Sequence, residues 1–277
     1  MHGRTSLFTV TALGLFTTSC AIVPVSRPAP DPRVATTVET CRASIRQPDG
    51  AVESGLGERI ELLNWNIKKG SRDVWQDDLR SIALDADLVV LQEAAANIGI
   101  EDAMPHLEHS SFARGFTTGN SMTGVATYSH TAPISECQFR TTEPWLRTPK
   151  ATSVTRYPLS DSEQTLLVVN LHAVNFTVGV ARYREQILQV RDVVEAHRGP
   201  IILSGDFNTW NRKRVKVVDT LVNELGLTTV SLHTDNRKTF NRYPLDHVFV
   251  RGFTEAEGGT VSVHSSDHNP MLIELLR

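Results

Sequence analysis

The stretch PIILSGDFN, residues 200–208, ends a short apolar run in a cluster of polar residues. Pro200–Leu203 is rich in branched aliphatic side chains and is bounded by turn residues, which is typical of a buried strand. Asp206 and Asn208 follow directly. A strand is a rigid support, and side chains at its end face a shared cleft. The stretch therefore predicts a strand-rich domain with a polar site at a sheet edge.

Similar apolar runs recur on both sides of this stretch. The clearest are Ile60–Ile67, Asp87–Leu91, Gly124–Tyr128, Thr165–Leu171, His247–Val250 and Met271–Leu276. Apolar residues at helical spacing predict helices over Val74–Leu84, Val180–His197 and Val215–Leu225. Strands interspersed with helices, without an internal repeat or a second linker, predict one layered α/β or α+β domain over residues 58–277.

Polar residues also lie next to most of the other runs. They are Asn66, Glu93, His172, Asn175, Asp246, Asp267 and His268. Carboxylate and amide oxygens are hard ligands that suit Mg²⁺ or Mn²⁺, and histidines transfer protons near neutral pH. His247 follows Asp246 directly, but neighbouring strand residues point to opposite faces, so we do not assign it to the site.

Several other hydrolytic mechanisms lack their motifs. The sequence has no H-E-x-x-H pair or Cys-x-x-Cys spacing for zinc, no G-x-S-x-G serine elbow and no phosphate-binding P-loop. Metal-assisted attack of water on a phosphoester remains as the predicted chemistry.

Six motifs resemble the endonuclease/exonuclease/phosphatase superfamily and occur in its order. They are LNWNI (63–67), VVLQE (89–93), VNLHAVN (169–175), SGDFN (204–208), LDHVFV (245–250) and SDHNP (266–270). The resemblance spans residues 58–277 and is strongest to a bacterial branch with runs like VVNLHAVNF and SGDFNTWNRKR. It implies a four-layer fold, in which two mixed β-sheets pack face to face with helices outside.

The resemblance also implies a metal site for Mg²⁺ or Mn²⁺. Asn66 and Glu93 would hold the metal, with Asp267 nearby. AP endonucleases of the family carry a second acidic ligand two residues after the first Asn. Lys68 stands at that position here, so their metal shell is not fully reproduced.

Six further residues take roles by the same resemblance. Asp206 would orient or deprotonate the attacking water, and Asn208 would hold the water or the phosphate. His268 would contact the scissile phosphate, with Asp246 hydrogen-bonded to it. His172 would assist the leaving group, and Asn175 would be a phosphate ligand. For Asn175, a plain turn in NFT (175–177) is an equally good interpretation.

The substrate is less constrained. The net charge of −3 makes no electrostatic case for nucleic acid, although an acidic average can hide a local basic groove. Basic residues near 212–216 and 237–242 would steer an anion or simply lie on solvated surface. A nuclease is our first hypothesis, and the sequence shows no evident exposed apolar hairpin for a sphingomyelinase-like enzyme. A lipid or small-molecule phosphoesterase is the alternative, and an inactive binding module ranks last.

The N-terminal segment resembles an export signal. A charged head, an apolar run at Leu7–Phe16 and small residues lead to Cys20, over residues 1–20. Cys20 resembles a lipoprotein acceptor, except that Thr17 stands where Leu is usual; plain secretion and a cytosolic leader are the alternatives. We therefore expect a protein of the periplasm or cell envelope with a possible lipid anchor at Cys20.

Residues 21–57 follow the export segment and are rich in proline, which predicts an extended, unpacked linker. Cys41 lies in this linker. The sequence leaves open whether Cys41 pairs with Cys137 or both remain free thiols.

Overall fold

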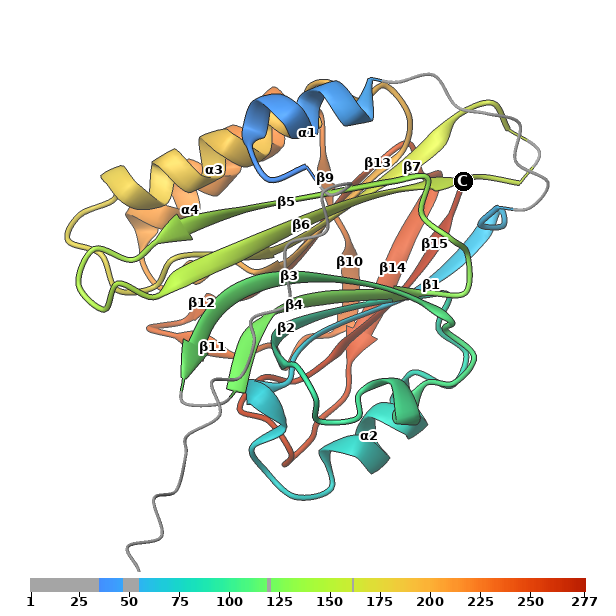
Figure 1. Ribbon diagram of the computed structural model, residues 1–277, viewed down its shortest axis with the longest axis horizontal. Coiled ribbons are helices and arrows are strands. Elements are labelled where there is room, and N and C mark those ends of the chain that lie inside the picture. The colour runs from blue at the N-terminus through green and yellow to red at the C-terminus, as the bar shows by residue number, and fades with distance from the viewer. Residues whose placement is uncertain (1–34, 47–54, 119–120, 161) are drawn as a thin grey trace, which may run out of the picture.

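The computed structural model describes residues 35–46, 55–118, 121–160 and 162–277. Two large β-sheets pack face to face, and helices lie on both outer sides (Figure 1). This confirms the four-layer α/β sandwich. The export segment, Cys20 and much of the linker lie outside the described residues.

The first sheet has seven strands and is mixed. Its spatial order is β10 (Ser231–Thr234), β14 (Glu255–Thr260), β15 (Met271–Leu276), β1 (Arg59–Asn66), β2 (Leu88–Ala95), β4 (Ser121–Ser129) and β3 (His109–Thr118). The central strands β1 and β2 run parallel, so their carboxyl ends meet at one sheet edge.

The second sheet has six strands. Its order is β5 (Ser135–Thr142), β6 (Pro149–Pro158), β7 (Thr165–His172), β8 (Ile201–Asp206), β13 (Asp246–Arg251) and β9 (Thr228–Thr229). Strands β7 and β8 are parallel, whereas β13 runs antiparallel to β8. The short strands β11 (Thr239–Phe240) and β12 (Tyr243–Pro244) form a separate hairpin.

Apolar side chains from the inner faces of both sheets form the central core. Leu62 and Val90 of the first sheet lie in one cluster with Val168, Ile202 and Val248 of the second. Both faces of the central strands are covered, which explains why their sequences are continuous apolar runs rather than alternating ones.

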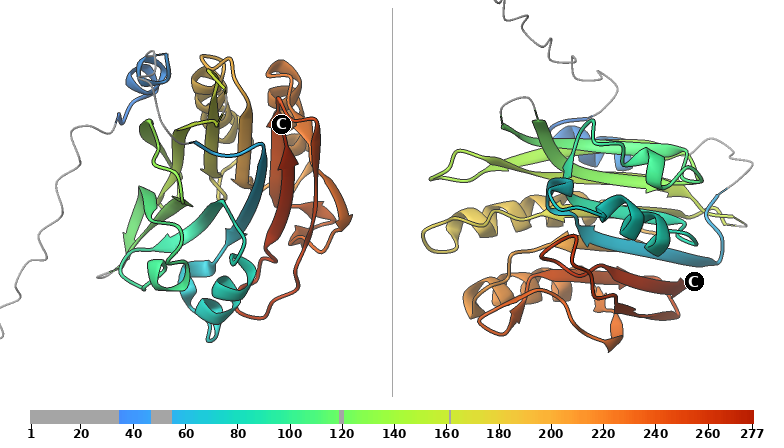
Figure 2. Two further views of the ribbon diagram at one scale, coloured as in Figure 1. Left: turned by 90° about the vertical axis from the view of Figure 1, so that its right-hand side faces the viewer. Right: turned by 90° about the horizontal axis from the view of Figure 1, so that it is seen from below.

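Helices cover the outer faces of the sandwich (Figure 2). Helices α3 (Ala181–Val194) and α4 (Arg212–Glu224) pack on the second sheet, and α2 (Trp75–Ile82) packs on the first. Short 3₁₀ turns occur at Lys68–Gly70 and Glu101–Ala103. No helix within the described ranges is long and apolar enough to cross a bilayer.

Part of the predicted linker is folded. Helix α1 (Val38–Ile45) begins at Thr37, whose side chain accepts a hydrogen bond from the backbone N–H of Thr40 in a capping box. Cys41 and Ile45 are buried against the second sheet and α3, and Cys41 forms a disulfide with Cys137 of β5. The prediction of unpacked chain is therefore wrong for this helix.

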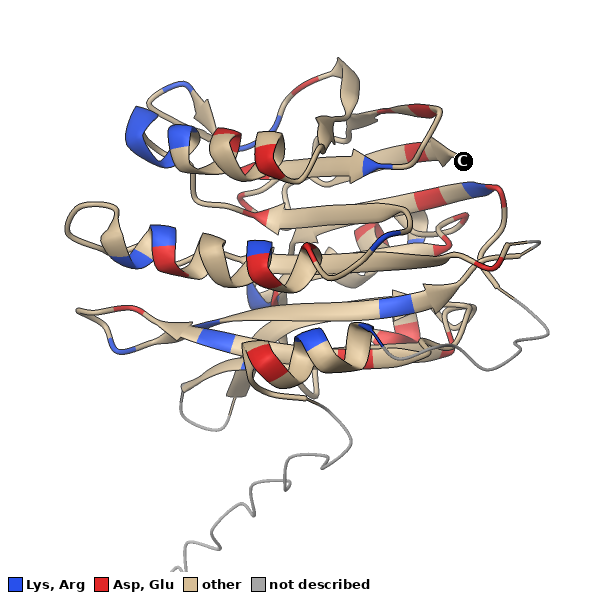
Figure 3. Cartoon of the chain, turned by 90° about the horizontal axis from the view of Figure 1, so that it is seen from above, with Lys and Arg blue, Asp and Glu red and all other residues tan. Residues whose placement is uncertain are grey.

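Charged residues of both signs are interspersed along the outer helices, as Figure 3 shows for the helical face that carries α1, α3 and α4. This pattern is typical of solvated helix surface and gives that face no single-sign field.

Candidate active site

Three neighbouring strands of the second sheet place predicted site residues side by side. His172 ends β7 and is in register with Asp206, which ends β8. Asp246 begins β13, and because β13 is antiparallel to β8 it is also in register with Asp206. The three side chains therefore lie at one edge of the sheet.

Gly205 allows β8 to approach β7 closely at this edge. Its φ is +147°, and a Cβ atom at this position would meet the backbone carbonyl of Leu171. Both observations exclude a side chain, which is a physical reason for glycine in SGDFN.

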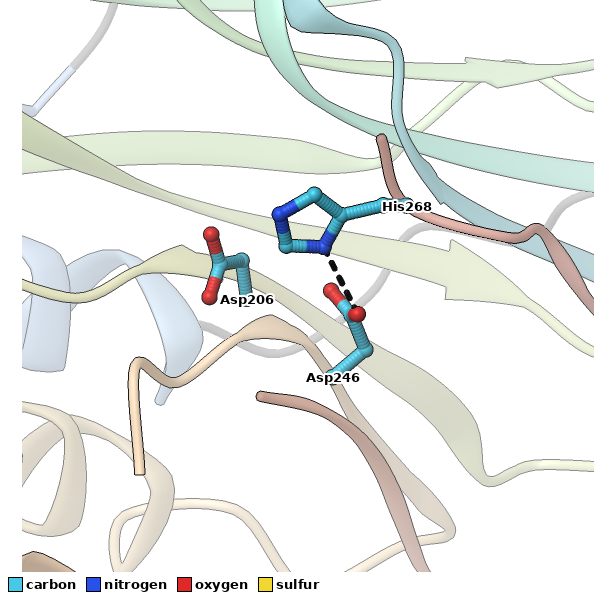
Figure 4. Close-up of side chains that lie close together, drawn as sticks. All are labelled: Asp206, Asp246 and His268. Carbon is cyan, nitrogen blue, oxygen red and sulfur yellow. Dashed lines mark hydrogen bonds and ion pairs between the residues drawn. The ribbon is translucent and has the colours of Figure 1, made fainter. Parts of the chain in front are cut away.

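His268 lies between two carboxylates (Figure 4). Its Nδ1 is 2.8 Å from Oδ2 of Asp246, so the predicted hydrogen bond is present. Ligand-type atoms of Asp206, Asp246 and His268 all lie within 4.8 Å of one another. Burial lowers the pKa of His268, but the nearby carboxylates, Asp246 first, outweigh it and raise the pKa to about 9. The imidazole is therefore protonated at neutral pH.

Asp206 is buried and accepts two hydrogen bonds. Nδ2 of Asn66 donates to its Oδ2 at 3.0 Å, and the backbone N–H of Asn208 donates to its Oδ1 at 3.0 Å. Burial raises the pKa of Asp206 to about 6, against the opposing charge of His268. Such a carboxylate is ionised at pH 7 and is suited to accept a proton near that pH.

His172 contacts Lys150, a residue outside every motif. Nε2 of His172 lies 3.0 Å from Nζ of Lys150 and 3.7 Å from Oδ2 of Asp206. Burial, followed by the charge of Lys150, lowers the pKa of His172 well below its usual value. The imidazole is therefore neutral, and Lys150 donates to it.

Asn208 and Asn175, the two asparagines predicted to bind the phosphate or the water, differ in exposure. Asn208 is buried with a φ of +49°, and its Nδ2 donates to the carbonyl of Ala173. Asn175 is partly exposed and lines a cavity together with Asn208. Both are therefore beside the cluster, with Asn175 nearer to solvent.

Arg214 holds the two loops that carry these asparagines. It belongs to the basic stretch at 212–216, which was predicted to steer an anion or to lie on solvated surface, but it is fully buried. It donates to the backbone carbonyls of Asn175 and Asn208 at 2.6 and 3.0 Å, and its guanidinium stacks 4.4 Å from the Tyr183 ring and 4.6 Å from the Trp210 ring.

Two of the three predicted metal ligands are acidic and lie beside lysines. Glu93 forms the bulge in β2, has a φ of +49° and lies 3.8 Å from Nζ of Lys69. Asp267 lies 3.6 Å from Lys68 and 3.8 Å from Lys238. Burial opposes ionisation of Asp267, but His268 and these two lysines outweigh it and lower its pKa.

The donor set fits a hard divalent cation. Glu93 supplies a carboxylate, and Asn66 supplies an amide next to the Asp206 carboxylate. Oxygen ligands of this kind suit Mg²⁺ and Mn²⁺. His268 is a poor ligand in this geometry, because its Nδ1 is bonded to Asp246 and its protonated ring has no free lone pair.

Further residues that support the site were not predicted. Trp65 Nε1 donates to the carbonyl of His268 at 2.9 Å, and Ser266 Oγ donates to the carbonyl of Asn66 at 2.7 Å. These bonds fasten the loop before β15 to the end of β1. LNWNI and SDHNP contain both residues, so the motifs pointed to them without showing the bonds.

A buried layer of amides lies beneath the site. Nε2 of Gln92 donates to Oδ1 of Asn64 at 3.0 Å and to Oδ1 of Asn170 at 2.9 Å. The layer joins β1 and β2 to β7 across the two sheets. These residues lie in apolar runs, where the strand pattern alone gives no signal for a polar network.

An apolar cavity of about 520 Å³ opens beside the cluster. Its lining includes Trp145, Phe176 and Phe240, which are 72%, 57% and 54% exposed. Trp145 and Leu146 lie in the loop of the β5–β6 hairpin. The expectation of no exposed apolar hairpin is therefore wrong, because the sequence did not predict β5 and β6 as strands.

The chain matches a known protein family and a bacterial relative. The profile of the Endonuclease/Exonuclease/phosphatase family matches residues 63–268. The UPF0294 protein of Yersinia enterocolitica is 39% identical over 218 residues, which cover 78% of this chain and 84% of that protein.

Solved structures share the fold at low sequence identity. A mannosyl-6-phosphatase of Bacteroides thetaiotaomicron is 19% identical with a TM-score of 0.58, over 79% of this chain and 100% of that one. Sphingomyelinase C from Streptomyces griseocarneus is 17% identical with a TM-score of 0.56, over 79% and 99%. The two proteins are named for different substrates, so the fold alone does not select one.

Proposed function

This chain belongs to the endonuclease/exonuclease/phosphatase family, and we propose that it hydrolyses phosphodiester bonds of nucleic acid with a divalent cation, Mg²⁺ or Mn²⁺. Members of the family are hydrolases that act on phosphoester bonds and generally use a divalent metal. The observation that carries the proposal is His268 held between the carboxylates of Asp246 and Asp206.

The protonation states of this cluster suit attack by water on a phosphodiester. Asp206, with a pKa of about 6, accepts the proton of the attacking water. His268, with a pKa of about 9, presents a cation to the phosphoryl oxygens and balances the charge that develops on them. A divalent cation held by Asn66 and Glu93 would polarise the same phosphate.

The leaving-group side is assigned to His172 and Lys150. The ammonium of Lys150 donates to neutral His172 at 3.0 Å, so this pair has a proton and a positive charge available. Asn175 and Asn208, at the cavity edge, hold the non-bridging oxygens of the phosphate.

Local charge favours a polyanionic substrate. Four lysines contact site residues: Lys68 and Lys238 beside Asp267, Lys69 beside Glu93, and Lys150 beside His172. These lysines offset the four carboxylates of the site, Asp206, Asp246, Asp267 and Glu93, so the site does not share the acidic average of the chain. Cations at a cleft raise the local concentration of an anionic substrate.

A lipid phosphoester is the second candidate. The exposed Trp145 and Leu146 of the β5–β6 hairpin favour it, because apolar loop tips can enter a bilayer surface. The lysines of the site do not discriminate between the two, since both substrates carry phosphate.

The proposed site of action is outside the cytoplasm. The Cys41–Cys137 disulfide supports this proposal, because such bonds persist in oxidising compartments. Fractionation of cells that express the full chain, with the oxidation state of Cys41 measured in each fraction, tests it.

Turnover assays test the proposed reaction. The purified chain is incubated with plasmid DNA, single-stranded DNA, RNA, sphingomyelin and phosphorylated inositols, with Mg²⁺, Mn²⁺ or EDTA. We expect metal-dependent cleavage of nucleic acid that Asp206→Ala abolishes and Asp219→Ala, at an exposed acid of α4, retains. Turnover of sphingomyelin alone would support the second candidate, a lipid phosphoesterase.

A further inference from the structure

We propose that the apolar cavity beside the cluster is a binding site for unpaired nucleobases, so that the substrate is single-stranded nucleic acid; this inference rests on the proposed function. The cavity is named here the aromatic groove, and its apolar lining includes Trp145, Phe176, Val178, Trp210 and Phe240. Its volume of about 520 Å³ is within the range of ligand sites.

The groove shares its wall with the reaction centre. Asn175 and Asn208 line it, and the backbone N–H of Asn208 donates to Asp206. A part of the substrate that binds in the groove therefore lies close to the phosphate that is cleaved. In a nucleic acid strand, that group is the base of a flanking nucleotide.

Aromatic rings dominate the lining. Four of the nine lining residues are aromatic, against 6% of the whole chain. Trp210 and Phe240 meet edge to face, with ring centroids 6.3 Å apart and an interplanar angle of 76°. Flat rings of this kind stack on flat ligands, whereas an acyl chain needs only aliphatic side chains.

The groove offers ring faces but few hydrogen-bonding groups. Thr177 Oγ1 already donates to the carbonyl of Gly179, and Nδ2 of Asn208 donates to the carbonyl of Ala173. Bases in a duplex have their faces covered by neighbours and only their edges free. The groove therefore fits unpaired bases and discriminates little between sequences.

Two of the loops that line the groove are held together before any ligand binds. The buried carboxylate of Glu143 accepts hydrogen bonds from the backbone N–H groups of Asn175 and Phe176 at 2.6 and 3.3 Å. Thr148 Oγ1 donates to the same side chain at 2.6 Å. Glu143 thus ties the loop of Trp145 to the loop of Phe176.

Charge at the rim matches a polyanion. Arg147 lies next to Leu146, and Arg242 lies in the β11–β12 turn after Phe240. Both are exposed, and neither has a carboxylate within ion-pair distance in the described parts of the chain. The β5–β6 loop, the β7–α3 loop and the β11–β12 turn lie at one end of the molecule, on the left in Figure 1. Phosphates on either side of a stacked base would meet these cations.

Equilibrium binding to the full chain in EDTA tests the groove without turnover. The probes are a fluorescent single-stranded oligonucleotide, the same sequence as a duplex, and the same strand with abasic sites. We expect the single strand to bind at least 10-fold tighter than the other two. Phe176→Ala and Trp145→Ala should each weaken it roughly 5- to 100-fold, as for loss of one stacked base.

Matched variants distinguish stacking on an aromatic ring from contact with any apolar side chain. Phe176→Leu should bind as weakly as Phe176→Ala, Phe176→Trp should bind like the wild type, and Leu84→Ala, at an exposed leucine after α2, should change nothing. Arg147→Ala should make the plot of log K against log salt concentration less steep, by about 1 in the magnitude of its slope.

Three results would overturn the inference. They are equal affinity for duplex and single strand, full affinity of Phe176→Leu, and unchanged oligonucleotide affinity of Trp145→Ala combined with lost binding to anionic vesicles. The last result would make the groove a bilayer contact. Cleavage of nucleic acid with metal is measured in parallel, so the groove can fail while the nuclease activity stands, or the reverse.

Discussion

Oδ2 of Asp246 lies 2.8 Å from Nδ1 of His268, and both side chains are buried. In this hydrogen bond Nδ1 carries the proton, and the other ring nitrogen, Nε2, faces the site. Asp206 lies on the other side of the imidazole. One histidine thus joins the second sheet, which carries both aspartates, to the loop before β15.

Asp246→Asn should weaken catalysis without unfolding the protein. The amide keeps the shape of the side chain but removes the largest charge that raises the pKa of His268. We expect kcat to fall roughly 10²- to 10⁴-fold, the range for a lost proton-transfer or charge contribution. The pKa of His268, followed by NMR, should fall from about 9 toward 6.5.

The NMR titration separates this effect from a general loss of structure. The backbone amide spectrum of Asp246→Asn, compared with that of the wild type, serves as the reference for an intact fold. An unchanged pKa of His268 in Asp246→Asn, with activity retained, would show that the pair does not set the protonation state.

Arg214→Lys should reduce activity more than it reduces stability. Lysine keeps the charge but cannot donate to the carbonyls of both Asn175 and Asn208 in one fixed geometry. We expect kcat/KM to fall roughly 10- to 100-fold and the free energy of unfolding to fall by about 1–3 kcal/mol. Kinetics below the melting transition and urea denaturation measure the two effects.

The exposed neighbour Arg212, on the same helix, supplies the control. Arg212→Lys should be neutral in both assays. If the activity of Arg214→Lys falls only in proportion to its folded fraction, the role of Arg214 is purely structural.

The sequence predicted the parts of the fold whose signal is local. The apolar runs of β1, β7 and β8 and the periodic helix α3 are visible in single segments. Strands β5 and β6 were missed because polar residues such as Thr, Ser and Arg interrupt their apolar residues. Helix α1 was missed because prolines surround it and its burial depends on a distant disulfide.

The candidate site divides in the same way. Asp206 and His268 lie in the motifs SGDFN and SDHNP, so the sequence predicted that both belong to the site. Lys150 reaches His172 only through the antiparallel register of β6 and β7, which no motif encodes. Arg214 was expected at the surface because it belongs to a basic stretch. Its burial between two aromatic rings depends on tertiary packing, which the local sequence does not show.

Removal of the disulfide should lower stability and leave activity intact. The bond joins residues 96 positions apart, and α1 packs on α3 and β5 rather than on the cluster. We expect Cys41→Ala/Cys137→Ala to lose about 2–4 kcal/mol in urea denaturation. Reductant should lower the wild type to the same level and leave the double variant unchanged. Loss of turnover by the folded double variant would contradict the assignment of α1 as a support.

His247 should make the folded protein sensitive to acid. It ends up on the face of β13 opposite Asp246, with its ring stacked on Phe249 at 5.4 Å and its Nε2 2.7 Å from Oγ1 of Thr209. Burial, followed by the charge of Arg237, lowers its pKa from 6.5 to about 4. Between these two values the unfolded chain binds a proton that the folded protein does not, so stability falls as pH falls below about 6.5 and stops falling near pH 4.

His247→Gln isolates this contribution, because glutamine donates a similar hydrogen bond and does not titrate. Urea denaturation in EDTA at pH 8 and pH 5 should show the wild type losing about 1–2 kcal/mol more than the variant. His172 and other shifted groups are common to both proteins and cancel in the difference. Equal losses would mean that His247 takes up its proton in the folded state at its ordinary pKa, and that the contact with Thr209 does not depend on a neutral ring.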